Sequence, residues 1–346
     1  MLLISGGAGF VGLNFLHHWC ARHASERVVV LDALTYASRR EGLSSLEQSG
    51  QVTLIHGDVA DLDAVNRVFA DHDITRVLHL AAESHVDRSI AGPAAFVRTN
   101  VVGTQVLLDA ARAAWQRNGV WRDGVRFHHV STDEVFGPLD ANAAPVTESA
   151  PYRPSSPYAA SKAAADHLVR SWGYTFGLPY VMTHCANNYG PWQHAEKLMP
   201  LMITRALAGE SLPVYGDGLQ RREWLHVTDH ARMLTGLLNS PSAHGSYNLA
   251  GNYECSNLEV VHTLCAAIDA AFAADLTLAE RYPNCPAARG VACISLVLHV
   301  TDRLGHDRRY ALNGNRLQTE MGMQATTTFE LGVSDTVRWY LNSERR

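Results

Sequence analysis

The chain of 346 residues lacks several patterns that mark whole classes of protein. Its six cysteines include no Cys-x-x-Cys pair, and its 18 histidines form no His/Cys cluster with zinc spacing. We therefore expect reduced, mostly buried thiols and no bound metal. The formal net charge is -5 and no long lysine or arginine run is present, so nucleic acid is not an expected partner.

Long hydrophobic segments are also absent. No apolar run reaches the roughly 18 residues that a membrane span requires, and no basic-then-apolar leader precedes the first expected strand, Leu2-Leu3-Ile4. We therefore expect a cytoplasmic protein without a membrane partner. Internal repeats and low-complexity tracts are missing too, and 47% hydrophobic and 18% charged residues are ordinary for a globular protein. At this length, two lobes or one enlarged α/β domain are both expected architectures.

What is present begins with a glycine-rich turn between a strand and a helix. Glycines at 6, 7, 9 and 12 follow the apolar residues 2–5, and an apolar helix is expected to about Arg22. Such glycines allow a tight turn and let the backbone approach a pyrophosphate, which the amides at the helix N-terminus receive. The pattern predicts a dinucleotide site, although a purely structural turn is the other interpretation.

The end of the next expected strand, Arg27–Asp32, selects between dinucleotides. Asp32 lies about 20 residues beyond the last glycine, where a carboxylate accepts hydrogen bonds from ribose hydroxyls. This favours NAD over NADP, because a carboxylate repels the extra phosphate of NADP. Arg39 and Arg40 follow closely and keep NADP as the alternative.

Strands and helices continue to alternate after Asp32, which predicts an α/β fold with a doubly wound parallel Rossmann sheet. The composition changes after Cys185, where Asn187-Asn188-Tyr189-Gly190-Pro191 interrupts the alternation. We expect a NAD-binding domain over residues 1–186, to which 227–251 return, and a smaller C-terminal substrate-binding lobe over 187–346. The expected strands are 52–58, 77–81, 125–130 and 180–185, the expected helices about 93–115, 157–176, 198–208, 257–273 and 329–342, and 213–218 is an expected turn. Residues 227–238 and 247–250 are the parts of the returning segment that we expect to lie in the first domain.

Reactive side chains gather where the expected strand 125–130 ends. Ser131-Thr132-Asp133-Glu134 follows this strand, and the carboxyl ends of parallel strands are where open α/β sheets bind ligands. Tyr158 and Lys162 follow Ser156-Pro157, a typical helix start, and lie four residues apart on one face. A hydroxyl, a phenol, an ammonium and two carboxylates together indicate redox chemistry combined with proton transfer.

Asp133 and Glu134 can act on one substrate only if the chain is not a regular strand at these two residues. Neighbours in a regular strand point to opposite faces, so the chain must leave strand geometry for Asp133 and Glu134 to reach one substrate. Gly137 and Pro138 follow within four residues and favour such a departure. Otherwise the acids are a polar strand exit or a helix cap.

These motifs resemble those of the nucleotide-sugar 4,6-dehydratases, within the extended short-chain dehydrogenase/reductase superfamily. The glycine motif is common to the superfamily, whereas Thr132-Asp133-Glu134 and the block from Gly305 to Tyr310 are far more specific. Sugar-nucleotide 4-epimerases share the Tyr/Lys pair but usually lack the acid pair. The sequence departs from the family at Ser38-Arg39, where relatives have Gly-Asn. The matching blocks are residues 6–12, 80–89, 131–137, 156–162, 187–191, 196–198 and 302–310.

The resemblance implies NAD as a retained cofactor, a nucleotide-sugar substrate, and a homodimer formed by the helices at about 93–115 and 157–176. The NAD contacts that it implies are Gly6, Gly9, Phe10, Val11, Gly12, Asp32, Thr35, Asp58, Val59, Leu80, Ala81, Ala82, Thr99, Tyr158, Lys162 and Asn188. The substrate contacts that it implies are Ser84, Thr132, Asn187, Lys197, Leu198, Pro213, Tyr215, Arg222, Asn257, Arg303 and His306.

The activity implied by the resemblance is conversion of dTDP-glucose to its 4-keto-6-deoxy product and water, with Thr132, Asp133, Glu134, Tyr158 and Lys162 as the catalytic residues. Tyr158 takes the C4 hydroxyl proton with help from Lys162 and Thr132, Glu134 removes the C5 proton, and Asp133 protonates the departing C6 hydroxyl. The nucleotide base is open, so another nucleotide hexose such as UDP-glucose is the alternative substrate. A non-catalytic NAD-sensing protein is the other hypothesis, which a degraded Tyr/Lys or Asp/Glu set would favour; all four residues are intact.

Overall fold

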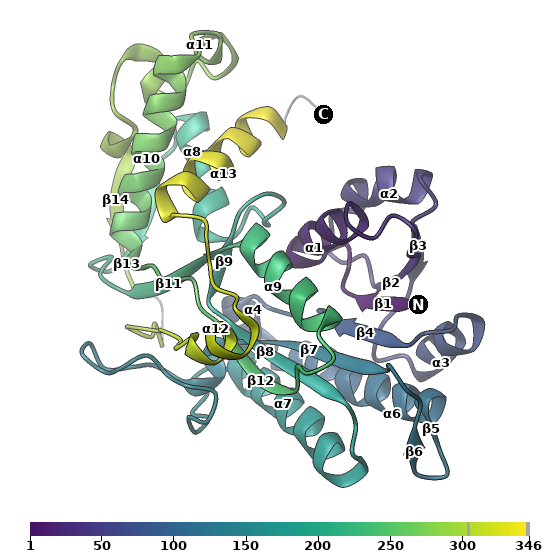
Figure 1. Cartoon of the computed structure of the whole chain (residues 1–346). Coiled ribbons are helices and arrows are strands. Elements are labelled where there is room, and N and C mark those ends of the chain that lie inside the picture. Colours follow the sequence, from purple (N-terminus) through teal and green to yellow (C-terminus); the bar gives the residue numbers. More distant parts are fainter. Residues whose placement is uncertain (303–304, 344–346) are drawn as a thin grey trace.

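A seven-stranded parallel sheet lies at the centre of the computed structural model, which describes residues 1–302 and 305–343 (Figure 1). Its strand order is β12-β8-β7-β4-β1-β2-β3, so the chain first runs outward from β1 to β3 and then crosses back to β4. The order reverses between β1 and β4, which makes their carboxyl ends a topological switch point. The strands are β1 (Leu2–Ser5), β2 (Val28–Asp32), β3 (Val52–His56), β4 (Arg76–His79), β7 (Arg126–Thr132), β8 (Tyr180–Cys185) and β12 (Gly245–Leu249).

Alternate residues of these strands pack into two cores on opposite faces of the sheet. In β1, Leu2 and Ile4 belong to the core beneath α1 and α9, whereas Leu3 belongs to the core with α3, α6 and α7 (Figure 1). Parallel strands covered on both faces read as nearly continuous hydrophobic runs, which is why the sequence predicts them well. The covering helices are α1 (Phe10–Cys20), α9 (Val227–Asn239), α3 (Leu62–Asp71), α6 (Gly103–Trp115) and α7 (Pro157–Phe176).

The chain leaves strand geometry immediately after β7. Thr132 is extended, with φ -136° and ψ 153°, and a 3₁₀ turn, η3 (Asp133–Phe136), begins at the next residue. The Thr132 hydroxyl accepts a hydrogen bond from the Glu134 amide at 3.3 Å. This turn takes Asp133 and Glu134 out of strand geometry, as they need in order to reach one substrate. It confirms that the acid pair does not continue the strand.

Helix α7 begins where the sequence predicts. The Ser156 hydroxyl caps it by accepting from the Ala159 amide at 3.1 Å, and Pro157 occupies the first turn, where its missing N–H costs nothing. Gly177, with φ 70°, ends the helix in the left-handed region. Tyr158 and Lys162 therefore face β7 from the first two turns of a well-capped helix.

The expected helix 93–115 is not one regular helix. It consists of α5 (Pro93–Phe96), a π-helical segment η2 (Val97–Val102) and α6. Asn100 of η2 is buried, and its side chain accepts from the Glu83 amide at 2.8 Å and donates to the Ser161 hydroxyl at 2.8 Å. The irregular turn thus binds the segment after β4 to α7, and π segments of this kind are frequent at functional sites.

The second part of the molecule has its own core, lined by α8, α10 and α13. The predicted turn at 213–218 is wrong in its first half, because β10 occupies Leu212–Tyr215 and pairs in parallel with β14. Its partner lies some 85 residues further along the chain, which no local pattern reveals. These elements are β9 (Asn187–Tyr189), β11 (Arg221–His226) and β13 (Glu254–Ser256) in a three-stranded sheet, β14 (Val297–Val300), α8 (Leu198–Ala208), α10 (Asn257–Ala274) and α13 (Phe329–Ser343).

Late in the chain, residues return to the first core. Leu312 and Leu317 belong to the same core as Leu2 and Tyr247, and α12 packs on β12. The shorter elements are η1 (Arg40–Leu43), α2 (Ser44–Gln48), α4 (Val86–Ala91), β5 (Gln116–Arg117), β6 (Val120–Trp121), α11 (Thr277–Arg281), η4 (Pro286–Arg289), η5 (Cys293–Leu296) and α12 (Asn315–Met321).

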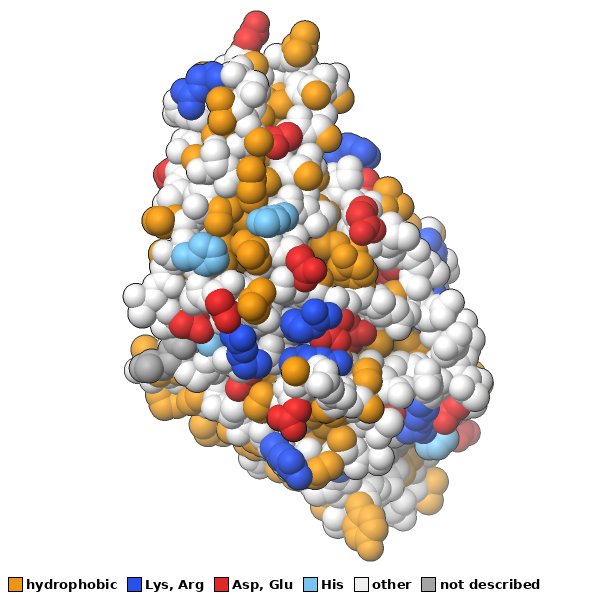
Figure 2. All heavy atoms as spheres, turned by 90° about the vertical axis from the view of Figure 1, so that its left-hand side faces the viewer, with side chains coloured by type: hydrophobic (Ala, Val, Ile, Leu, Met, Phe, Trp, Pro, Cys, Tyr) orange, Lys and Arg blue, Asp and Glu red, His pale blue; other side chains and the backbone are white. Residues whose placement is uncertain are grey.

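Helix α10 is, among residues 1–302 and 305–343, the one helix that is long and apolar enough to cross a membrane by length and composition alone. Val260, Leu264 and Ile268 on one of its faces are buried in the second core, which accounts for the apolar composition. Figure 2 shows the side of the molecule that carries α10 and β14, where basic and acidic side chains are interspersed.

Candidate active site

A cavity of about 180 Å³ lies at the switch point between β1 and β4. Nine of the predicted NAD contacts line it, while Phe10, Val11 and Gly12 begin α1 beside it and Leu80 follows β4. Tyr158, Lys162 and Asn188 lie instead toward the acid pair and the second lobe. The nine lining residues are Gly6, Gly9, Asp32, Thr35, Asp58, Val59, Ala81, Ala82 and Thr99.

The glycine turn has the close approaches that the dinucleotide pattern requires. Gly6 has φ +75°, and a Cβ there would lie 2.6 Å from the Ala81 amide nitrogen of the neighbouring strand exit. A Cβ on Gly12 would lie 2.5 Å from the Gly6 carbonyl oxygen, so α1 packs directly on the turn. These contacts leave the α1 N-terminus open to the cavity, and the residues present therefore fit a dinucleotide.

Asp32 is buried at the end of β2 and organises the same turn. Its two oxygens accept from the Ala8 amide, the Leu34 amide and the Ser38 hydroxyl at 2.8, 2.8 and 2.9 Å. Ser38 therefore binds Asp32 directly, although the family usually has glycine there. The carboxylate still lines the cavity, where it disfavours a second phosphate.

The five predicted catalytic residues converge at the ends of β7 and α7. Thr132, Asp133 and Tyr158 are buried, and the Thr132 hydroxyl donates to Asp133 Oδ1 at 3.2 Å. Thr132 also forms a side-chain hydrogen bond with Tyr158, and Glu134 lies close enough to shift the pKa of Tyr158. The structure therefore brings the hydroxyl, the phenol and both carboxyl groups into one corner.

The two acids of this corner differ in environment. Burial, with the neighbouring Glu134 carboxylate adding to its effect and Arg222 opposing it, raises the pKa of Asp133 to about 8. Asp133 is only 4% exposed. A carboxyl group with such a pKa is protonated at neutral pH, so Asp133 can donate a proton where an ordinary aspartate cannot.

The phenol and the ammonium are both desolvated. Burial raises the pKa of Tyr158 well above its usual value, Glu134 and Cys185 add to the rise, and the hydrogen bond with Thr132 opposes it. Burial lowers the pKa of Lys162, and the Asp166 carboxylate opposes that fall. Lys162 Nζ donates to the Val130 carbonyl at 2.8 Å, so it contacts β7, and it lies one helical turn beyond Tyr158.

A second cavity, of about 220 Å³, collects most of the predicted substrate contacts. Ser84 and Thr132 do not line this cavity, although Ser84 is flanked in the chain by Glu83 of the first cavity and His85 of the second. Arg303 is outside the described residues. His306 Nδ1 donates to Asp302 Oδ1 at 2.6 Å, and the His306 ring meets that of Tyr215 edge-on at 6.3 Å between centroids. The predicted residues that line it are Asn187, Lys197, Leu198, Pro213, Tyr215, Arg222, Asn257 and His306.

The segment before α8 crosses to the loop after β4 and joins the two cavities. Lys197 Nζ donates to the Ser84 carbonyl at 3.1 Å, and Glu196 pairs with Arg88 at 2.7 Å and with His85 at 3.2 Å. Arg88 and Glu196 are 46% and 37% exposed, whereas Asp133 is buried. The sequence predicted Ser84 and Lys197 as substrate contacts. It did not predict the ion pairs of Glu196, which join residues more than 100 positions apart.

Two more groups near the acid pair were not predicted. Tyr310 is buried, donates to Asp307, and lies beneath the Arg222 guanidinium at 4.7 Å from the ring centroid. Asp166 lies on α7 one turn beyond Lys162 and is fully buried. Its spacing of four residues from Lys162 was the available sequence signal, because such residues share a helix face.

Comparison with known proteins agrees with this geometry. The family described as GDP-mannose 4,6 dehydratase matches residues 3–336. The dTDP-glucose 4,6-dehydratase of Xanthomonas campestris pv. campestris (strain B100) is 48% identical over 99% of this chain and 93% of its own, and that of Shigella flexneri is 45% identical over 98% and 92%. The Streptomyces venezuelae dTDP-glucose 4,6-dehydratase, solved with NAD bound, is 40% identical, covers 99% of this chain and 98% of its own, and superposes with a TM-score of 0.84.

The fold, the glycine turn and the Tyr158/Lys162 helix are those of the extended short-chain dehydrogenase/reductases. Within that superfamily, the chain belongs to the dTDP-glucose 4,6-dehydratase family.

Proposed function

We propose that the protein is a NAD-dependent hydro-lyase that converts dTDP-glucose to dTDP-4-keto-6-deoxyglucose and water. The observation that carries the proposal is the pair Asp133 and Glu134 in η3, with Asp133 protonated at neutral pH, beside Tyr158. An epimerase or a simple dehydrogenase needs the phenol but has no use for a second acid and base. Elimination of water needs both.

The chain's residues divide the proton transfers among them. Tyr158 accepts the proton of the C4 hydroxyl, which Thr132 orients. Because burial raises the pKa of the phenol, the positive charges of Lys162 and of a bound nicotinamide would have to stabilise the phenolate. Glu134 then removes the C5 proton, which the new C4 ketone makes acidic. Asp133 gives its proton to the C6 hydroxyl, which leaves as water. A bound NAD would supply the hydride acceptor for C4 and the hydride donor for C6, so that no net oxidant or reductant is consumed.

The remaining predicted contacts hold the two ligands. The glycine turn and Asp32 bind the cofactor, and Lys197, Arg222 and His306 bind the diphosphate and nucleotide through charge-assisted hydrogen bonds. We assign residues 1–186 with 227–251 to cofactor binding and 187–346 mainly to the nucleotide sugar. The buried Arg222 supports this assignment, because its charge lies between the second cavity and Asp133.

Incubation with a panel of nucleotide hexoses in heavy water tests the function. We expect dTDP-glucose to lose one water and its product to carry solvent deuterium at C5. Glu134→Gln keeps the side-chain shape but removes the basic oxygen, so C4 oxidation survives while reduced cofactor and the 4-keto hexose accumulate. Faster dehydration of UDP-glucose would mean that UDP-glucose is the substrate. Dehydration without deuterium at C5 would overturn the assignment of Glu134 as the catalytic base.

We also infer a homodimer in the cytoplasm. Ile90, Val97 and Val102 are exposed large hydrophobic residues on α4 and η2, in line with α6 and α7, and such side chains favour burial against a second copy. The six cysteines are free thiols, of which Cys285 and Cys293 lie with their sulfurs 3.7 Å apart, and a reducing compartment would keep this pair reduced. Light scattering of the wild type and of Val97→Glu tests the dimer, since a charge in that surface lowers the mass to that of one chain.

A further inference from the structure

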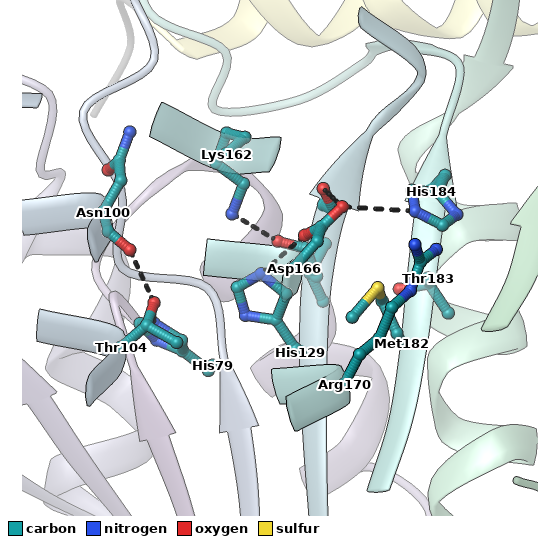
Figure 3. Close-up of polar contacts among 12 residues, drawn as sticks. His79, Asn100, Thr104, His129, Lys162, Asp166, Arg170, Met182, Thr183 and His184 are labelled. Atoms are coloured by element: carbon teal, nitrogen blue, oxygen red, sulfur yellow. Dashed lines mark hydrogen bonds and ion pairs between the residues drawn. The ribbon is translucent and has the colours of Figure 1, made fainter. Parts of the chain in front are cut away.

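Asp166 is a buried acid that the proposed reaction does not use. It follows Lys162 by one turn of α7, and Figure 3 shows both side chains directed at β7. Its carboxylate accepts from His129 Nε2 at 3.1 Å, the Ser131 hydroxyl at 2.9 Å and the Tyr152 phenol at 2.7 Å. His184 Nε2 lies 3.3 Å away. A carboxylate with no exposed surface and four such neighbours is a built polar centre.

These contacts fix three consecutive residues of β7 to α7. His129 and Ser131 bind Asp166, and the carbonyl of Val130 between them accepts from Lys162. Thr132, Asp133 and Glu134 follow directly in the chain. Asp166 therefore sets how the helix that carries Tyr158 sits against the strand end that carries the acid pair.

The ionisation of Asp166 is set by burial and by its hydrogen-bond partners, which have opposite effects. Burial alone would raise the pKa of Asp166, but hydrogen bonds from His129 and His184 outweigh it, and the pKa lies well below its usual range. Burial lowers the pKa of His129 to about 4, so this imidazole is neutral. Asp166 is thus the negative charge that faces the buried ammonium of Lys162 from the next turn of the helix.

Other titratable groups also surround Lys162. His79 on β4 is buried, and burial holds its pKa well below its usual value, so it is neutral. Cys185 on β8 is a protonated thiol, because burial raises its pKa to about 12. Arg170, two turns along α7, binds Tyr152 at 2.8 Å. Tyr158 precedes Lys162 by one turn of α7, and Glu134 lies in η3.

We propose that Asp166 is a positioning residue for the dehydration: it fixes the end of β7 through His129 and Ser131, and its buried negative charge keeps Lys162 an ammonium. The inference rests on the proposed function for its catalytic consequence. The effect on the ionisation of Lys162 is independent of the proposed function, because this ionisation can be measured without substrate.

The chain makes this measurement simple because it contains only two lysines, Lys162 and Lys197. Lysine-selective ¹³C labelling therefore gives two side-chain titrations by NMR, and Lys197→Arg assigns them. In Asp166→Asn, we expect the midpoint of Lys162 to fall by about 1–3 pH units, as when an opposite charge is removed from a nearby group. Lys197 should keep its wild-type midpoint.

Kinetics supply the second readout. In Asp166→Asn, kcat for C4 oxidation, followed as reduced cofactor in a single turnover, should fall by about 10²-fold with KM within roughly threefold. The fall should deepen as pH rises, because Lys162 then loses its proton at lower pH. Ser131→Ala removes one anchor and keeps the charge, so it should slow the reaction without moving the Lys162 midpoint.

Matched controls separate these effects from general destabilisation. Asp71→Asn makes the same change at an exposed carboxylate at the end of α3 and should leave both readouts unchanged. Tyr152→Phe removes a neutral partner of Asp166 and should lower thermal stability without moving the Lys162 midpoint. A folded Asp166→Asn with wild-type Lys162 titration and wild-type kcat would overturn the proposal. Should that variant not fold, a wild-type Lys162 midpoint below pH 7 would overturn it equally.

Discussion

The inner and outer ends of the site are built from different kinds of interaction. At the inner end, Asp133 and Lys162 are each 4% exposed, and their partners lie on the rigid elements β7 and α7. At the outer end, the Arg88 and Glu196 side chains that join the two lobes are 46% and 37% exposed, and they come from the short helix α4 and from the segment before α8. Charges in the first group are shifted strongly by burial, whereas those in the second are screened by water and salt.

The difference separates two tasks. Proton transfer needs groups with unusual pKa values held in place, which a dry corner between a strand end and a helix provides. Binding of a nucleotide diphosphate needs positively charged side chains that the ligand can reach and leave. Exposed side chains at the boundary between the two lobes meet this need. Substitutions at the inner end should therefore act on kcat, and those at the outer end on KM.

The largest effect is expected from Tyr158→Phe. This change keeps the ring and removes the proton acceptor for C4 oxidation, so turnover should fall by about 10²–10⁴-fold. Loss of dTDP-glucose and the appearance of reduced cofactor measure it. Tyr174→Phe on the same helix is the matched control, because Tyr174 is 95% exposed and should have wild-type activity. A Tyr158→Phe enzyme with near wild-type oxidation would move the proton acceptor to another residue.

The second prediction concerns pH. Asp133 donates only while protonated, and with a pKa of about 8 the elimination step should weaken as pH rises above 8, by about tenfold per pH unit. Asp133→Asn should be slower at neutral pH and should lack this alkaline decline. A 6-fluoro substrate, whose leaving group needs no proton, should show little loss in the variant. An identical pH profile for wild type and variant would exclude Asp133 as the acid.

The inner end was also the part that the sequence predicted best. Asp133, Glu134, Tyr158 and Lys162 each follow directly from a strand end or a helix start, and apolar runs, glycines and caps mark those places locally. The departure at Asp133 followed from the same logic, because two adjacent acids cannot serve one substrate from a strand. The sequence did not predict Asp166 as part of the site. Its spacing of four residues from Lys162 is present in the sequence, but this spacing alone does not distinguish a buried partner from a solvated acid.

The outer end shows where local patterns stop. Strand β10 was predicted as part of a turn because its pairing with β14 joins distant segments. The contacts of Glu196 with Arg88 and His85, and of Lys197 with Ser84, likewise depend on how the second lobe meets the loop after β4. The resemblance to a family identified Ser84 and Lys197, but only the fold shows that they touch.

A third, smaller effect is expected from Lys197→Ala. A hydrogen bond to a charged group is worth about 1.5–3 kcal/mol, so loss of the ammonium should raise KM for the nucleotide sugar by roughly 10–100-fold with kcat little changed. Steady-state kinetics at low and high salt measure it. Lys197→Arg, which keeps the charge, should recover most of the affinity. A fall in kcat equal to the rise in KM would mean that the outer end takes part in the chemistry.

The smallest effect should come from Glu196→Gln, and it tests the contrast directly. Exposed ion pairs contribute little because both partners are well hydrated when apart, so the loss of the pairs with Arg88 and His85 should raise KM by no more than about fivefold and leave kcat unchanged. The remaining difference from wild type should disappear at high ionic strength, since the Debye length is then about 3 Å at 1 M salt. Both enzymes should be assayed at 0.05 M and 1 M salt against dTDP-glucose, with Lys197→Ala alongside. If Glu196→Gln instead reduced turnover as strongly as Asp133→Asn, at any salt concentration, the outer contacts would be as preorganised as the inner ones, and exposure would not be what separates binding from chemistry in this site.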